Sequence, residues 1–126
     1  YTLVDFEPGL ADSLAACDLV LARSGASVFE LAAAGRPAIL VPYPHATGRD
    51  QHANAEWMAS AGAAIVVEDE ALDGEAVLRI AASMLADDLR LETMAAAART
   101  LAMPDAAERV ASELLTAIRR RGRVAS

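Results

Sequence analysis

The sequence contains no lysine, a single cysteine and few aromatic residues, and each shortage limits what the chain can be. All 11 basic residues are arginine, and 18 Asp and Glu residues outnumber them, which gives a formal net charge of −7. A chain this acidic argues against general nucleic-acid binding. The lone Cys17 has no partner for an internal disulfide, which favours a reducing cytoplasm. Because only 4% of residues are aromatic and 55% are apolar, the core must consist mainly of Ala, Leu and Val.

Several motifs of common enzymes are also missing. The sequence has no Walker P-loop, no Gly-Xaa-Ser-Xaa-Gly elbow and no dinucleotide fingerprint, which excludes the usual P-loop and hydrolase classes. Its His, Cys, Asp and Glu residues do not occur at metal-ligand spacings, so we expect neither a metal nor another cofactor. No apolar run is long enough to span a bilayer. The basic cluster near residue 120 fits either a helix end matched to its dipole or a contact with an anionic membrane surface.

Strand-like and helix-like segments alternate through the first half of the chain. The pattern predicts strands at 1–6, 19–22, 38–41 and 63–67, and helices at 9–17, 27–34 and 50–61. Such alternation predicts an α/β fold, a Rossmann-like parallel sheet with helices on its faces. Three helices should follow at 73–85, 88–101 and 105–120, the last with an apolar stripe that needs a partner. Four strands are few for such a sheet, so we expect further strands before Tyr1 in a longer protein.

The segment from Arg23 to Glu30 is the most informative stretch, because a turn with Gly25 leads out of a buried strand and into a helix. The first amides of a helix lack intrahelical partners and lie at the positive end of its dipole, which favours a bound phosphate. Glu30 lies one turn along, where it can reach a hydroxyl-bearing group beside the phosphate. The simpler alternative is a capping box, in which Ser27 and Glu30 only satisfy the amides of their own helix.

A second polar segment is the long loop at 42–51, which ends with Asp50 and Gln51 at a helix start. Ligands of open α/β sheets bind beyond the carboxyl ends of the strands, where this loop and the Gly25 turn both lie. An acid and an amide together can bind adjacent sugar hydroxyls. The alternatives are that Asp50 is only a helix cap, that Gln51 is a solvated first-turn residue, and that His45 is a loop residue bonded to the backbone.

Taken together, the string from Arg23 to Pro42 and the stretch from His45 to Asn54 resemble the MurG family, the UDP-N-acetylglucosamine transferases that make peptidoglycan lipid II. The shared features are a Ser-Gly-Ala turn, a Glu in the next helical turn, an Ala-Ala-Gly-Xaa-Pro stop and a downstream Gln-Xaa-Xaa-Asn-Ala. The resemblance implies the GT-B fold, in which two Rossmann-like domains face a cleft. Residues 1–126 then correspond to an incomplete carboxyl-terminal domain that binds the UDP-sugar, without the amino-terminal acceptor domain.

The resemblance also implies which residues contact the donor substrate. The uracil falls on the backbone of Glu7 and near Leu10, Glu30 accepts from the ribose hydroxyls, and Gln51 with Asp50 contacts the N-acetylglucosamine ring. Arg23 and His45 line the same cleft. The pyrophosphate falls on the turn and helix start, formed by Ser24, Gly25, Ala26, Ser27 and Val28.

The implied reaction is inverting transfer of N-acetylglucosamine from UDP-N-acetylglucosamine to undecaprenyl-pyrophosphoryl-muramyl-pentapeptide, without a metal, at the inner face of the bacterial membrane. The general base and the acceptor surface belong to the amino-terminal domain, so we expect no catalysis from this chain alone. Three alternatives remain at this stage. One is another GT-B transferase that moves a UDP-hexose to a lipid, the second is a non-catalytic sugar-nucleotide-binding subunit, and the third is a plain α/β interaction module.

Overall fold

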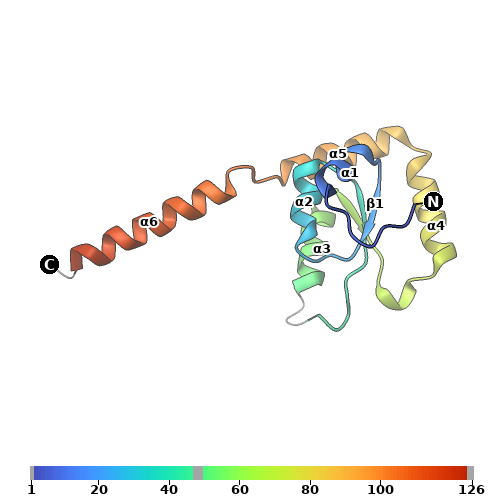
Figure 1. Ribbon diagram of the computed structural model, residues 1–126. Coiled ribbons are helices and arrows are strands. Elements are labelled where there is room, and N and C mark those ends of the chain that lie inside the picture. Colours follow the sequence, from blue (N-terminus) through green and yellow to red (C-terminus); the bar gives the residue numbers. More distant parts are fainter. Residues whose placement is uncertain (1, 47–49, 125–126) are drawn as a thin grey trace.

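The computed structural model describes residues 2–46 and 50–124, with side chains as far as residue 120, and it is built around a parallel three-stranded sheet (Figure 1). The strands are β1 (Val20–Ala22), β2 (Ala38–Leu40) and β3 (Ala64–Val66), in the order β1-β2-β3. Val20 is aligned with Ala38, and Ala38 with Ala64. The predicted α/β, Rossmann-like parallel sheet is therefore confirmed.

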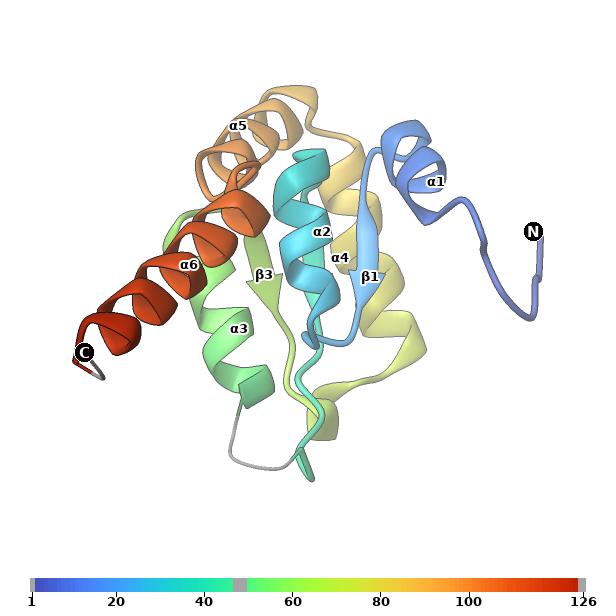
Figure 2. The same cartoon turned by 60° about the vertical axis from the view of Figure 1, so that its left-hand side comes forward.

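Helices cover both faces of the sheet. Figure 2 shows α2 (Ser27–Ala34) in front of the strands and α4 (Gly74–Leu85) behind them. Two further helices, α3 (Asp50–Ser60) and α5 (Asp88–Thr100), complete the layers, and α1 (Leu10–Ala16) packs against α2. The helices predicted from periodicity are all present; α2 has the expected ends, and the ends of the others differ by at most four residues from those expected. A short 3₁₀ helix, η2 (Asp69–Ala71), follows β3 and was not predicted.

The central strand shows why a parallel strand is apolar along its whole length. Ala38 and Leu40 are buried in a cluster with residues of α2 and α3, whereas Ile39 is buried in a second cluster with Met84 of α4. Successive side chains of a strand point to opposite faces, so both faces of β2 need apolar residues. The sheet is thus enclosed on two sides, and its carboxyl edge is left for polar groups.

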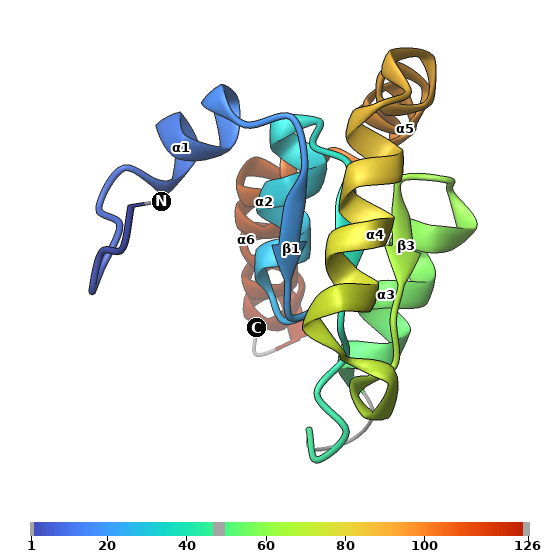
Figure 3. The same ribbon diagram turned by 90° about the vertical axis from the view of Figure 1, so that its right-hand side faces the viewer.

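The strand predicted at 1–6 is wrong. Residues 2–7 belong to no strand, and Leu3 and Phe6 are 78% and 79% exposed. The segment leads away from the sheet beyond α1, as Figure 2 and Figure 3 both show. Alternating apolar residues favour a strand only where a neighbouring strand supplies hydrogen bonds and a covered face, and this segment has neither. Tyr1 lies outside the described residues.

The last helix, α6 (Ala106–Val124), projects away from the rest of the molecule (Figure 1). Its predicted apolar stripe is exposed, with Val110 at 61%, Leu114 at 60% and Ile118 at 66%. Within the described part of the chain, nothing covers this stripe. None of the helices described is both long enough and apolar enough to cross a membrane.

Candidate functional site

The turn between β1 and α2 is not a capping box. The helix begins at Ser27, its N-cap is Ala26, and no side chain caps it. A capping box requires the serine one position earlier, at the N-cap, so that its hydroxyl accepts from the third helical amide. The alternative in which Ser27 and Glu30 only satisfy their own helix is therefore wrong, and both side chains remain available for other contacts.

Several consecutive backbone amides of this turn are free donors, and those of Gly25, Ala26 and Ser27 stand directly at the helix start. The amide of Val28 donates to the carbonyl of Gly25, and that of Phe29 to the carbonyl of Ala26, both at 3.2 Å. The amides of Gly25, Ala26 and Ser27 donate to no acceptor among residues 2–46 and 50–124. An anion at a helix start binds such amides, which also lie at the positive end of the helix dipole.

Gly25 is not required by the fold itself. Its φ is outside the left-handed region, and a Cβ built on it would meet no atom within 4 Å. Gly35 differs in both respects, because its φ is +63° and a Cβ there would lie 2.6 Å from Cγ of Arg99. The open space in front of Gly25 gives a ligand close access to the backbone.

Two hydrogen bonds hold this turn against the start of α3. Ser24 is fully buried, and its Oγ donates to the carbonyl of Gln51 at 2.7 Å. In the other direction, Nδ2 of Asn54 donates to the carbonyl of Ser24 at 3.0 Å and reaches that of Gly25 at 3.5 Å. The hydroxyl of Ser24 is thus engaged within the protein, and the turn and α3 are fixed relative to each other.

The side chain of Gln51 is oriented by the loop that precedes α3. Its Oε1 accepts from the amide of Tyr43 at 2.9 Å, which leaves Nε2 as the group that can donate to a ligand. The alternative of a merely solvated first-turn residue is therefore wrong. Asp50 is the exposed first residue of α3. The loop residues Thr47, Gly48 and Arg49 lie outside the described residues.

Arg23 connects the segments that follow all three strands. Its guanidinium forms an ion pair with Asp69 of η2, and Nη1 lies 3.5 Å from the carbonyl of Val41, at the end of β2. The same guanidinium lies over the ring of Tyr43, 5.5 Å from its centroid, and the ring of Tyr43 meets that of His45 edge-on at 5.6 Å. The structure therefore brings Arg23 and His45 to one edge of the sheet.

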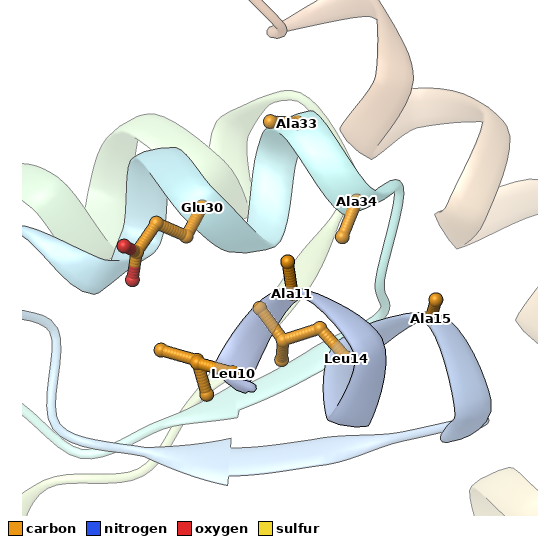
Figure 4. Close-up of a pocket in the computed structure, with 7 residues that line it drawn as sticks. All are labelled: Leu10, Ala11, Leu14, Ala15, Glu30, Ala33 and Ala34. Carbon is orange, nitrogen blue, oxygen red and sulfur yellow. The ribbon is translucent and has the colours of Figure 1, made fainter. Parts of the chain in front are cut away.

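Leu10 and Glu30 line one pocket of about 340 Å³ between α1 and α2 (Figure 4). They lie toward the same end of the pocket in the figure, one from each helix. The other lining residues are small or aliphatic: Ala11, Leu14, Ala15, Ala33 and Ala34. An apolar wall with a single carboxylate suits a flat ring joined to a group that carries hydroxyls.

Glu7 does not line this pocket. It is exposed, and its Oε1 accepts from the amide of Gly9 in a local turn at 2.8 Å. Three neighbours at the sheet edge were not predicted as site residues, namely Tyr43, Asn54 and Asp69. Only Asn54 had a signal in the sequence, because it stands three residues after Gln51 and so shares its side of the helix. No set of three metal-ligating side chains comes together among the residues that are described.

Comparison with known proteins identifies the family. The model of the glycosyltransferase family 28 C-terminal domain matches residues 1–110. The chain belongs to this family. A family 28 relative from Rhodospirillum centenum is 45% identical over 92% of the chain, and one from Halorhodospira halophila is 49% identical over 87%. Both are named UDP-N-acetylglucosamine–N-acetylmuramyl-(pentapeptide) pyrophosphoryl-undecaprenol N-acetylglucosamine transferase.

A solved structure shows the same fold for this family 28 domain. MurG of Acinetobacter baumannii superposes with a TM-score of 0.82 and 33% identity, covering 91% of the chain. The match covers 33% of that protein, and the chain covers 31% of each of the two curated relatives. The chain therefore spans about a third of the length of the relatives it matches.

Proposed function

We propose that this chain is the donor-binding part of an inverting transferase. The transferase moves N-acetylglucosamine from UDP-N-acetylglucosamine to undecaprenyl-pyrophosphoryl-muramyl-pentapeptide in peptidoglycan synthesis. The names of its family 28 relatives support this substrate pair. The observation that carries the proposal is the pocket shared by Leu10 and Glu30, two residues assigned separately to the uracil and the ribose of one nucleoside.

The nucleoside occupies the pocket between α1 and α2. A carboxylate only accepts hydrogen bonds, so Glu30 suits the two neighbouring hydroxyls of a ribose. The aliphatic wall that includes Leu10 and Leu14 gives the base an apolar surface. Because Glu30 follows Ser27 by three residues, its backbone lies about 4.5 Å farther along the helix axis, which places ribose and phosphates side by side.

The diphosphate binds the free amides of Gly25, Ala26 and Ser27. These donors stay in place while the sugar–phosphate bond breaks, so they stabilise the negative charge that develops on the departing UDP. The reaction therefore needs no metal at the diphosphate.

The N-acetylglucosamine ring lies at the start of α3. Nε2 of Gln51 donates to one ring hydroxyl, and the carboxylate of Asp50 accepts from a neighbouring one. The bond from Ser24 to the carbonyl of Gln51 supports this placement, because it holds α3 at a fixed distance from the diphosphate turn.

The remaining parts of the reaction require an amino-terminal domain that is not among these 126 residues. That domain provides the general base and the surface for the lipid-linked acceptor, so the present chain binds donor without catalysing transfer. The acceptor's lipid places the whole enzyme peripherally on the inner face of the bacterial membrane. Arg23 and His45 lie at the same edge of the sheet as this donor site, where they can meet the phosphate or the acceptor.

Calorimetric titration of the chain with three sugar nucleotides tests the proposal. We expect UDP-N-acetylglucosamine to bind more tightly than UDP-glucose or UDP-galactose, because only the first carries the acetamide. Preference for a sugar without the acetamide would indicate a different lipid glycosyltransferase of the same fold. Absence of binding by all three would leave an α/β interaction module and would overturn the proposal.

A further inference from the structure

The side chain of Asn54 points across α3 to the β1–α2 turn, and it contacts two carbonyl groups there. Nδ2 lies 3.0 Å from the carbonyl oxygen of Ser24 and 3.5 Å from that of Gly25. Both neighbours are acceptors, so the donor nitrogen must be on this side. An oxygen in its place would face two carbonyl oxygens.

These two carbonyls determine where the free amides point. The described peptide bonds are all trans, and in a trans peptide the C=O and N–H groups point in opposite directions. The amide of Gly25 belongs to the same peptide plane as the carbonyl of Ser24, and the amide of Ala26 to that of Gly25. Asn54 holds the carbonyl of Ser24 toward α3 and, together with the amide of Val28, fixes the carbonyl of Gly25, so the amides in the same two peptide planes point away from Asn54.

A second bond restricts the same contact from the other side. The buried Oγ of Ser24 donates to the carbonyl of Gln51, so each segment donates one side-chain hydrogen bond to the backbone of the other. Two bonds in opposite directions prevent the turn from rotating about either one. The turn therefore has one orientation before any ligand binds.

We infer that Asn54 is a positioning residue for the diphosphate site. It does not touch the ligand through these contacts, and it acts by aiming the amides of Gly25 and Ala26. This inference rests on the proposed function, to which it adds a residue and a role. Binding then benefits because the donors need no reorganisation when the diphosphate arrives.

The test compares UDP with uridine, which lacks the diphosphate, in NMR titrations of the chain. In Asn54→Ala and Asn54→Asp, we expect UDP binding to weaken about tenfold, the equivalent of one good hydrogen bond. Uridine binding should stay unchanged, because the pocket at Leu10 and Glu30 is untouched. Asn54→Asp is the sharper variant, since it keeps the side-chain shape but places an oxygen against the two carbonyls. Glu56→Gln, on the exposed side of α3, is the matched control.

A second measurement needs no ligand. In the variants, the amide signal of Gly25 should move, whereas the signals of Leu10 and Glu30 should stay in place. Equal loss of UDP and uridine binding would show that Asn54 only supports the fold, and undiminished UDP binding would also overturn the inference. If the unsubstituted chain bound uridine but not UDP, the diphosphate site itself would be refuted. If it bound neither, the proposed function would fall, and this inference with it.

Discussion

Glu30 combines two properties that helix structure alone does not explain. It stands in the first turn of α2, where a carboxylate is favoured by the helix dipole, yet it caps nothing and faces a pocket with otherwise aliphatic walls. Covering a carboxylate with a ligand costs free energy unless the ligand donates hydrogen bonds to it. A ribose provides two such donors.

Replacement of Glu30 should therefore affect binding and not stability. We expect Glu30→Ala to weaken UDP binding by about 1 to 3 kcal/mol, since hydrogen bonds to a charged group are lost. The melting temperature should hardly change, because Glu30 is exposed and makes no capping bond. Calorimetry and thermal unfolding measure the two effects separately. Loss of stability with normal UDP binding would mean that Glu30 supports the helix and does not bind the nucleotide.

Gln51 allows a substitution that separates its two hydrogen-bonding groups. Gln51→Glu keeps an oxygen for the amide of Tyr43 but removes the Nε2 donor. We expect the affinity for UDP-N-acetylglucosamine to fall by about 1 kcal/mol while that for UDP stays the same. Titration of both ligands gives this difference directly. An equal fall for UDP and the sugar nucleotide would mean that Gln51 supports the loop and not the sugar.

At this scale, the sequence reveals residues whose role is set by their immediate neighbours. Gly25 and Glu30 belong to one local strand–turn–helix pattern, so their positions follow from the spacing. Tyr43 and Asp69 become neighbours of Arg23 only because three parallel strands end at one edge. Such contacts depend on the tertiary fold, and no spacing within the sequence indicates them.

At the scale of elements, two glycines next to α2 serve opposite purposes. Gly35 ends the helix: its amide donates to the carbonyl of Ala32 and the amide of Arg36 to that of Leu31, the pair of bonds of a Schellman motif. That ending requires the positive φ of Gly35, and close packing with Arg99 requires its lack of a Cβ. Gly25 meets neither requirement, and the open space in front of its backbone suits the diphosphate that we propose to bind there.

Alanine substitutions should distinguish the structural role of Gly35 from the ligand-binding role proposed for Gly25. We expect Gly35→Ala to destabilise the fold by about 1 to 2 kcal/mol from the left-handed backbone alone, with the clash against Arg99 in addition. Gly25→Ala should leave stability unchanged or raise it slightly, yet weaken UDP binding about tenfold.

For the glycine variants, urea unfolding measures the stability of the fold and UDP titration measures the affinity for UDP. Gly74→Ala is the control, because a Cβ there also meets no atom within 4 Å and the residue begins α4, away from the site. Normal UDP binding by Gly25→Ala would contradict the assigned diphosphate turn.

The elements that the sequence predicts well are those whose pattern reflects their own packing. The helices bury one face, so their periodicity is visible in the sequence, and the three strands are short continuous apolar runs, as expected in a parallel sheet with helices on both faces. The segment at 1–6 has a similar local composition but no neighbour to pair with. Whether a strand forms there depends on groups far away in the sequence, and local pattern carries no information about them.

The exposed stripe of α6 predicts that this helix contributes little to the stability of the sheet domain. Since Leu114 and Ile118 are exposed, replacing both with Ser should change the free energy of unfolding by no more than about 0.5 kcal/mol. The fluorescence of Trp57, the only tryptophan, reports on the sheet domain because this side chain packs against its core. Leu31→Ala, in the core, is the contrast and should cost about 2 to 5 kcal/mol. A comparable loss in the α6 variant would mean that the stripe packs on the domain.

At the scale of the whole molecule, the fold brings the polar residues of the candidate site together at the carboxyl edge of the sheet. The segments after β1, β2 and β3 are joined there by Arg23, by Ser24 and by Gln51. Glu30, which lines the pocket with Leu10, lies in the first turn of the helix that follows the first of these segments. The other two sides of the sheet are closed by helices. This division follows from parallel strands, whose carboxyl ends meet at one edge, and it brings the candidate site residues together there.

The most direct test is an NMR titration of the isotope-labelled chain with UDP-N-acetylglucosamine, which locates the ligand residue by residue. We predict that the amide signals of Leu10, Gly25, Glu30 and Gln51 shift together and saturate at one ligand concentration, while those of α4 and α6 stay unchanged. Shifts confined to α4 or α6, or no shifts at all, would contradict the account.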